Sequence, residues 1–187
     1  SMLANYYDVA LEDRFRELFG HLEIGRNPTP LHNQYFILQW DFSCINPSGS
    51  AEDIKTALWN HVNTCIKDFI LYYEKFLTRE VEIYPQDAIS SLRSLIPVIR
   101  MTGRPVYLLI DEYDNFANEV MMGVRREKKE IYEALVYEEG PLKTLFKAVK
   151  SSTKESLFDR IFITGVSPVV MSDITTGYNI GENIYLR

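Results

Sequence analysis

The stretch Val106-Tyr107-Leu108-Leu109-Ile110-Asp111-Glu112 decides the fold of this 187-residue chain. Its first five residues are all apolar or aromatic, without the polar alternation of a strand that faces water on one side. A strand that is apolar on both faces belongs in the middle of a parallel sheet that helices cover. The stretch therefore predicts a buried central strand that ends in two neighbouring carboxylates.

Two further strands are expected, one before and one after this stretch. Residues 35–42 are mostly aromatic or aliphatic and have polar neighbours, and the apolar-rich residues 160–164 end at Gly165. The segments between the strands carry helical patterns. Strands that alternate with helices form a parallel sheet through right-handed connections. The predicted fold class is therefore α/β, with a three-layer parallel sheet.

Apolar residues at three- and four-residue spacing predict the helices. The expected helical segments are residues 3–19, 54–77, 86–101 and 128–137, the segment that starts at Pro141, and a short piece at 169–174. Within the first segment, Asp8 and Asp13 are candidate break points. Ser50 and Asp53 resemble a capping box before the second segment. Gly103 is expected to close the third.

The composition excludes several classes of protein. Hydrophobic residues make up 46% of the chain and charged residues 25%, which are ordinary values for a globular domain and not for a disordered chain. The net charge of −6 argues against a dedicated polyanion binder, whose surface would be basic overall. No apolar run approaches the roughly 20 residues that span a bilayer. With Cys44 and Cys65 as its only cysteines, the chain is expected in the cytoplasm.

Polar residues follow each predicted strand, at the edge of the sheet where α/β proteins bind their ligands. They are Asp41 and Ser43, Asp111 and Glu112, and Thr164. An apolar strand followed by two acids has the form of a Walker B element. In this interpretation Asp111 holds Mg²⁺, usually through water, and Glu112 polarises the attacking water. Thr164 donates a hydrogen bond to the γ-phosphate or to that water, the role called sensor 1.

The loop that would hold the phosphates is missing from the sequence. Such a site needs Gly-x4-Gly-Lys-Ser/Thr, whose backbone amides wrap the β- and γ-phosphates. Gly20 and Gly25 have the glycine spacing, but Arg26 and Asn27 follow them and no predicted strand leads into Gly20. We therefore interpret residues 20–33, which contain two X-Pro steps, as an ordinary loop.

Other residue patterns have ordinary explanations. Asp114 completes the form Asp-Glu-x-Asp of a helicase motif, but the cap of a turn explains it too, and we prefer the cap. The basic residues at 125–130 alternate with glutamates, which is typical of a solvated helix face rather than of a nucleic-acid contact. His21, His32 and His61 are dispersed and lack paired partners at ligand spacing, so a zinc site is not expected.

Several segments of the chain resemble the AAA-ATPase-like family and occur in the order found in that family. They are Phe19-Gly20-His21-Leu22-Glu23-Ile24-Gly25, Leu38-Gln39-Trp40-Asp41-Phe42-Ser43, Asp111-Glu112-Tyr113-Asp114, and Phe162-Ile163-Thr164-Gly165-Val166-Ser167-Pro168 with Thr175-Thr176-Gly177-Tyr178-Asn179-Ile180. The resemblance implies a single P-loop NTPase-type domain over residues 1–187 that uses ATP and Mg²⁺. Family members carry their phosphate-loop lysine and serine shortly before a helix like residues 3–7. The chain is therefore expected to begin just after that loop and its strand.

The resemblance also implies the roles of the site residues. Asp111 would bind Mg²⁺ and, through it, ATP; Glu112 and Thr164 would be catalytic, and Ser167 is a further catalytic candidate. In this family a PD-(D/E)XK nuclease-like domain often follows the ATPase domain, and a nucleic-acid partner follows from family analogy alone. Without a phosphate loop, these residues are expected to be inactive by themselves. A non-catalytic protein-interaction module on the same scaffold, or a helicase-like nucleic-acid-dependent ATPase, stay open as alternatives.

Overall fold

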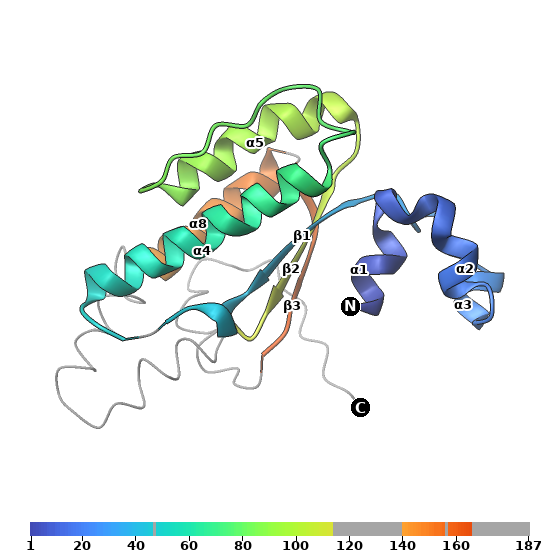
Figure 1. The fold of residues 1–187 in the computed structure, drawn as a ribbon, viewed down its shortest axis with the longest axis horizontal. Helices are drawn as coiled ribbons and strands as arrows, with labels where there is room; N and C mark the ends of the chain where they lie inside the picture. Colours follow the sequence, from blue (N-terminus) through green and yellow to red (C-terminus); the bar gives the residue numbers. More distant parts are fainter. Residues whose placement is uncertain (47, 114–139, 156, 166–187) are drawn as a thin grey trace.

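Three parallel strands form the sheet at the centre of the computed structural model (Figure 1). The structure describes residues 1–46, 48–113, 140–155 and 157–165. The strands are β1 (Phe36–Asp41), β2 (Val106–Asp111) and β3 (Phe158–Ile163), in the order β1-β2-β3. The predicted central strand is confirmed, because the first five residues of β2 are buried and only Asp111 is exposed.

The register of the strands brings their carboxyl ends to one edge of the sheet. In the ladder between β1 and β2, Phe36 lies opposite Val106 and Asp41 lies opposite Asp111. On the other side of β2, Ile110 pairs with Ile163. All three strands run in the same direction, so the residues that follow them are neighbours in space.

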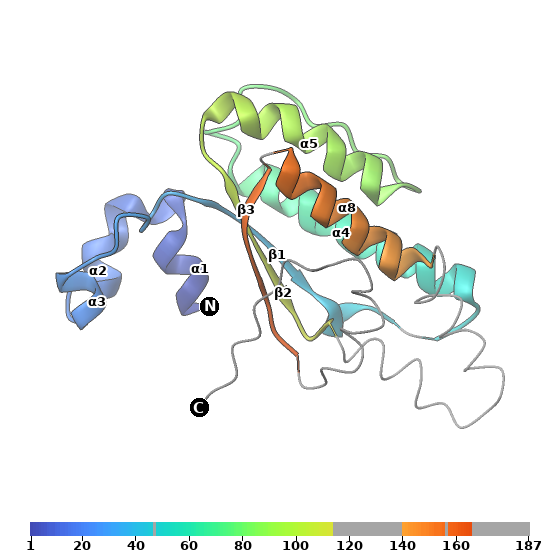
Figure 2. The ribbon, with the colours of Figure 1, turned by 180° about the vertical axis from the view of Figure 1, so that it is seen from behind.

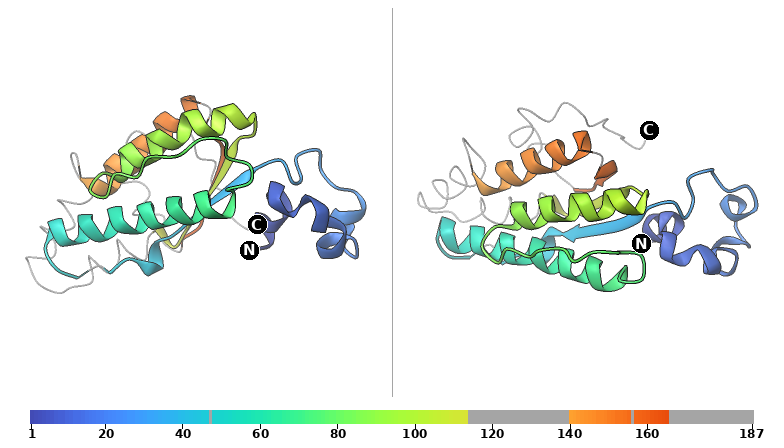
Figure 3. Two further views of the ribbon diagram at one scale, coloured as in Figure 1. Left: turned by 45° about the horizontal axis from the view of Figure 1, so that its top comes forward. Right: turned by 90° about the horizontal axis from the view of Figure 1, so that it is seen from above.

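Three long helices cover one face of the sheet (Figures 1 and 2). They are α4 (Ala51–Tyr72), α5 (Ala88–Thr102) and α8 (Pro141–Lys154). Their apolar stripes pack with alternate strand residues, among them Trp40 and Leu108, in one large core. Burial of apolar surface on this scale is the main stabilising contribution to such a fold. Figure 3 shows α4 and α5 lying along each other over the sheet.

The opposite face of the sheet carries α1 (Met2–Tyr7). Ala4 is buried there with Ile37 and Leu109, and Leu3 and Tyr7 pack against the same small cluster. Helices therefore lie against both faces of the sheet, and the predicted α/β class is confirmed. Within the described residues the two helical layers are unequal, with one short helix against three long ones.

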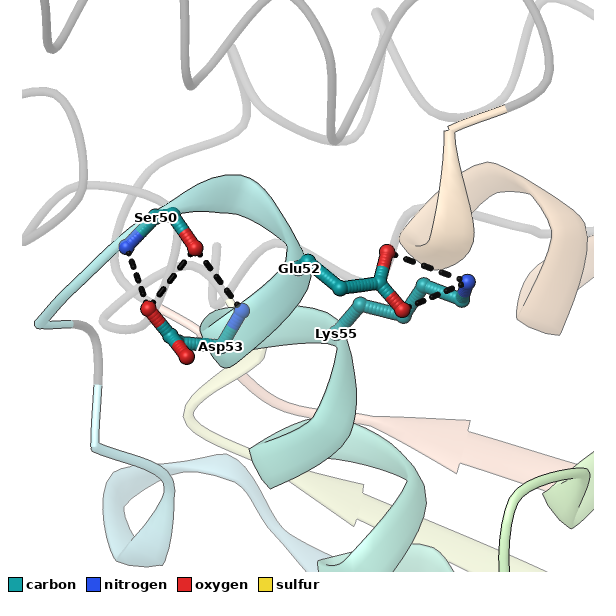
Figure 4. A network of polar contacts seen from close by, with 4 residues as sticks. All are labelled: Ser50, Glu52, Asp53 and Lys55. Carbon is teal, nitrogen blue, oxygen red and sulfur yellow. Dashed lines mark hydrogen bonds and ion pairs between the residues drawn. The ribbon is translucent and has the colours of Figure 1, made fainter.

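The predicted helix caps account for where the long helices begin and end. Ser50 Oγ accepts from Asp53 N, and Ser50 N donates to Asp53 Oδ2 at 2.9 Å, so the capping box of α4 is confirmed (Figure 4). Figure 4 also shows the ion pair between Glu52 and Lys55 on the first turns. Gly103 closes α5 with a φ of 69°, a left-handed conformation that glycine adopts without steric cost.

The long helix α4 ends earlier than the apolar spacing predicts. Its last residue is Tyr72, and Tyr73 leaves the helical conformation with a φ of −101° and a ψ of 18°. Leu77 still packs against the core, but from the turn that follows the helix. The prediction of a helix to residue 77 is wrong. Leu77 keeps the helical spacing of apolar residues because it packs on the core, although it lies after the end of the helix.

The N-terminal segment agrees with the prediction in one place and departs from it in another. The helix expected at 3–19 breaks at Asp8, as proposed, into α1, the 3₁₀ helix η1 (Val9–Arg14) and α2 (Phe15–Phe19). The loop expected at 20–33 contains a short helix, α3 (Glu23–Arg26). It packs so closely on the preceding turn that a Cβ at Gly25 would lie 1.8 Å from Phe19 O. Gly25 is thus required by a close backbone contact.

Two predicted helices, at residues 128–137 and 169–174, lie outside the described residues. Within the part of the chain that the structure describes, we find no helix with both the length and the apolar character needed to cross a bilayer.

Candidate functional site

The predicted site residues meet at the carboxyl edge of the sheet. Asp41 and Asp111 are the last residues of β1 and β2 and are direct register partners. Thr164 follows β3, and its backbone N–H donates to Ile110 O at 2.8 Å, which extends the pairing of β3 with β2. Both aspartates are exposed and Thr164 is partly exposed. The edge therefore presents two carboxylates and one hydroxyl to solvent.

A side-chain hydrogen bond joins β2 to β3 at this edge. Thr164 Oγ1 donates to Asp111 Oδ1. Oγ1 also lies 3.4 Å from Ile110 O, which is longer than an ordinary O–H···O bond. Hydrogen bonds to an ionised carboxylate are shorter and stronger than those between neutral groups. The Thr164 hydroxyl therefore donates its hydrogen bond to Asp111 Oδ1 rather than to Ile110 O.

Glu112 leaves β2 in a left-handed backbone conformation with a φ of 49°. This conformation costs a residue with a Cβ about 1–2 kcal/mol, and such strain clusters at functional sites. The backbone N–H of Glu112 donates to Asp111 Oδ1 at 3.0 Å, and its side chain is exposed. The two neighbouring carboxylates consequently differ: Asp111 is held by hydrogen bonds, whereas Glu112 is open to solvent.

Asp41 organises the turn that follows β1. Its Oδ1 accepts from Ser43 Oγ at 2.6 Å and from Ser43 N at 3.0 Å. The hydrogen bond from the Ser43 side chain is the main cause that lowers the pKa of Asp41. Asp41 therefore stays ionised at neutral pH, and it caps the 3₁₀ helix η2 (Phe42–Cys44).

His61 of α4 comes close to Asp41 without any signal in the sequence. Burial lowers the pKa of His61, and the nearby Asp41 carboxylate opposes that shift. Cys65 Sγ lies 3.6 Å from His61 Nε2, one helical turn further along α4. Burial raises the pKa of Cys65 to about 12, so its thiol stays protonated and is a poor nucleophile.

The donor set at the edge suits Mg²⁺. Both hydrogen bonds that Asp111 accepts from described residues end on Oδ1, so Oδ2 is open to a cation or its water. Mg²⁺ prefers hard oxygen donors and keeps several waters, with one or two carboxylates and substrate phosphates as its other ligands. No group of three or more histidine, cysteine or acidic side chains forms a ready-made metal cage in the described ranges. The residues present therefore fit a hydrated Mg²⁺ shared with phosphates.

Ser167 and Asp114, which the sequence also singled out, lie outside the described residues. The structure thus brings together Asp111, Glu112 and Thr164, and it adds Asp41 as the register partner of Asp111. Asp41 was one of the polar residues predicted at this edge. The electrostatic influence of Asp41 on His61 depends on how α4 lies over the end of β1, which the spacing of residues in the sequence does not reveal.

The family model described as "Predicted AAA-ATPase" matches residues 1–175 of the chain. Neither the curated proteins nor the solved structures contain a significant match.

Proposed function

The chain belongs to the AAA-ATPase-like family, and from this membership we propose that it carries the Walker B and sensor 1 part of an ATP-hydrolysing domain of the P-loop NTPase type. One observation supports the proposal above the others. Asp111 ends the most buried strand, Glu112 follows it directly, and the Thr164 hydroxyl, just after the neighbouring strand, donates to Asp111 at the same edge. A Walker B acid and a sensor hydroxyl require this juxtaposition.

The proposed chemistry assigns one task to each side chain. When bound, Mg²⁺ would supply positive charge that offsets the negative charge of the phosphates during phosphoryl transfer. Asp111 would hold this ion, mainly through its water ligands. Glu112, whose exposed carboxylate makes no hydrogen bond to another described residue, would orient and polarise the attacking water. With ATP bound, Thr164 would donate to the γ-phosphate or to that water in place of Asp111, and Ser167 is a further candidate donor.

ATP binding needs a phosphate loop besides these residues. No Gly-Lys-Ser or Gly-Lys-Thr occurs in the 187 residues. Backbone amides of such a loop hold the β- and γ-phosphates. We therefore propose that the 187-residue chain alone binds ATP weakly and does not turn it over.

A non-catalytic interaction module on the same scaffold is the second candidate, and the missing phosphate-binding motif favours it. The full-length gene product separates the two. A Gly-x4-Gly-Lys-Ser/Thr segment in that product, together with Mg²⁺-dependent ATP turnover, supports the ATPase.

The decisive variant is Glu112→Gln in the full-length gene product. It keeps the shape of the side chain and removes the negative charge that would polarise water. We expect ATP turnover to fall at least about 100-fold, since general acid–base catalysis contributes about 10²–10⁴-fold, while ATP binding persists. Glu80→Gln, at an exposed position in the loop after α4, is the matched control and should leave turnover unchanged. Unchanged turnover in Glu112→Gln would remove the assigned role.

A further inference from the structure

Two donors from different parts of the fold converge on one oxygen of Asp111. Thr164 Oγ1, from the end of β3, and Glu112 N, from the turn after β2, both donate to Oδ1. Two charge-assisted hydrogen bonds at one oxygen fix the orientation of a carboxylate. We infer that Thr164 is a positioning residue for Asp111, which holds the carboxylate so that Oδ2 is the oxygen left for the divalent cation.

The backbone makes Thr164 suited to this task. Thr164 N donates to Ile110 O at 2.8 Å, so the residue is tied to β2 directly beside the side chain that it holds. Asp111 itself is exposed, and an exposed carboxylate without such a partner would rotate freely. Groups that orient a metal-binding carboxylate typically change metal affinity about 10–100-fold when they are removed.

Positioning and phosphate sensing differ in the acceptor of the hydrogen bond from Thr164 Oγ1. The acceptor is Asp111 Oδ1 in the positioning role and a phosphate oxygen in the sensing role. A hydroxyl has a single proton to donate. In this structure the Thr164 hydroxyl donates its hydrogen bond to Asp111, because Ile110 O, the other nearby acceptor among the described residues, lies 3.4 Å away. Cation binding without any nucleotide therefore isolates the positioning role, since no γ-phosphate is present to be sensed. The inference rests on the proposed function, because the cation is the Mg²⁺ of that site.

The test measures Mn²⁺ binding to the 187-residue chain without nucleotide, by the electron paramagnetic resonance signal of free Mn²⁺. Mn²⁺ takes the same oxygen ligands as Mg²⁺. Thr164→Val removes the hydroxyl and keeps the branched shape, and we expect the dissociation constant to rise about tenfold. Thr164→Ala should show the same loss, and Thr164→Ser should restore binding. Thr153→Val is the control, because Thr153 Oγ1 donates to Lys150 O within α8 at 2.7 Å, away from the edge.

The outcomes test the positioning role of Thr164 and the cation-binding role of Asp111 separately. If both Thr164→Val and Thr164→Ala bind Mn²⁺ like wild type while Asp111→Asn does not, the positioning role is overturned and the cation role of Asp111 stands. If Asp111→Asn binds like wild type, the cation role and the inference both fall. A wild-type chain without measurable Mn²⁺ binding also overturns the inference, whereas the ATPase proposal then depends on the separate Glu112→Gln experiment.

Discussion

The hydroxyl of Tyr73 donates to Asp8 Oδ1 at 2.9 Å and accepts from the backbone N of Ile37, also at 2.9 Å. One side chain at the end of α4 thus joins the break after α1 to the second residue of β1. Asp8 is itself buried and also accepts from Ala10 N and from the Tyr72 hydroxyl. This network fastens the N-terminal segment to the sheet that carries the site.

Tyr73→Phe should destabilise the chain strongly. It leaves the Ile37 N–H without its acceptor and takes one donor from the buried Asp8, and each unsatisfied buried polar group costs about 1–3 kcal/mol. We expect the free energy of unfolding in urea to fall by about 2–3 kcal/mol. Tyr72→Phe is the matched comparison: it also takes one donor from Asp8, but it leaves the Ile37 N–H its acceptor, and Tyr72 is 54% exposed, so the loss should be smaller, about 1 kcal/mol. Equal losses in the two variants would contradict this account.

Ser50→Ala should remove the capping box that starts α4. The loss of an N-cap side chain costs about 1 kcal/mol, because a backbone N–H of the first turn loses its acceptor. Ser48→Ala changes an exposed serine of the same loop, outside the helix, and should leave stability unchanged within error. Urea denaturation measured by circular dichroism decides it, and a Ser50→Ala variant as stable as the wild type would contradict the prediction.

Much of the fold was predictable because its signals are local. The residues of β2 before Asp111 are all apolar or aromatic, whereas a strand with one solvent-exposed face would alternate with polar residues. Ser50 and Gly103 cap the ends of α4 and α5 through hydrogen bonds and backbone conformation that involve only the adjacent helical turn. The errors come from tertiary packing. Leu77 is apolar because it packs on the core from a turn, and α3 forms where Gly25 permits close contact with Phe19.

The candidate site was predictable only where topology determines position. Parallel strands must place their carboxyl ends at one edge, so Asp111 and Thr164 were expected to meet there. The position of His61 next to Asp41 depends on the placement of α4 over the turn after β1, for which the spacing of residues gives no indication. The roles of Asp111, Glu112 and Thr164 in catalysis stay predictions.

The stability of the chain should fall as the pH drops below neutral, partly because of His61. Burial lowers the pKa of His61 in the folded state, so between that pKa and the ordinary value of about 6.5 the unfolded chain binds more protons. Stability from this group is therefore present above about pH 6.5 and is lost as the pH falls toward the folded pKa. His61→Gln should flatten the dependence of the urea midpoint on pH between about 5 and 7.5.

Asp41→Asn tests the electrostatic influence of Asp41 on His61. Asp41 raises the pKa of His61, against the larger effect of burial, so its removal should lower that pKa further and increase the loss of stability between about pH 7.5 and 5, above the range in which Asp41 itself titrates. His21→Gln, at an exposed position of the N-terminal segment, is the control for His61→Gln, because it also removes one histidine. An Asp41→Asn variant with a shallower pH dependence than the wild type would disprove the coupling.

Glu112 should cost the fold stability through its backbone conformation. Its φ of 49° disfavours residues with long side chains, whereas asparagine adopts the left-handed region readily. Glu112→Asn and Glu112→Gln both replace the carboxylate by an amide, so their difference isolates the backbone conformation. We expect the asparagine variant to be more stable than the glutamine variant by about 0.5–1 kcal/mol in urea denaturation. Equal stability would show that the backbone at this turn is not strained, and the argument from strain to function at Glu112 would then be lost.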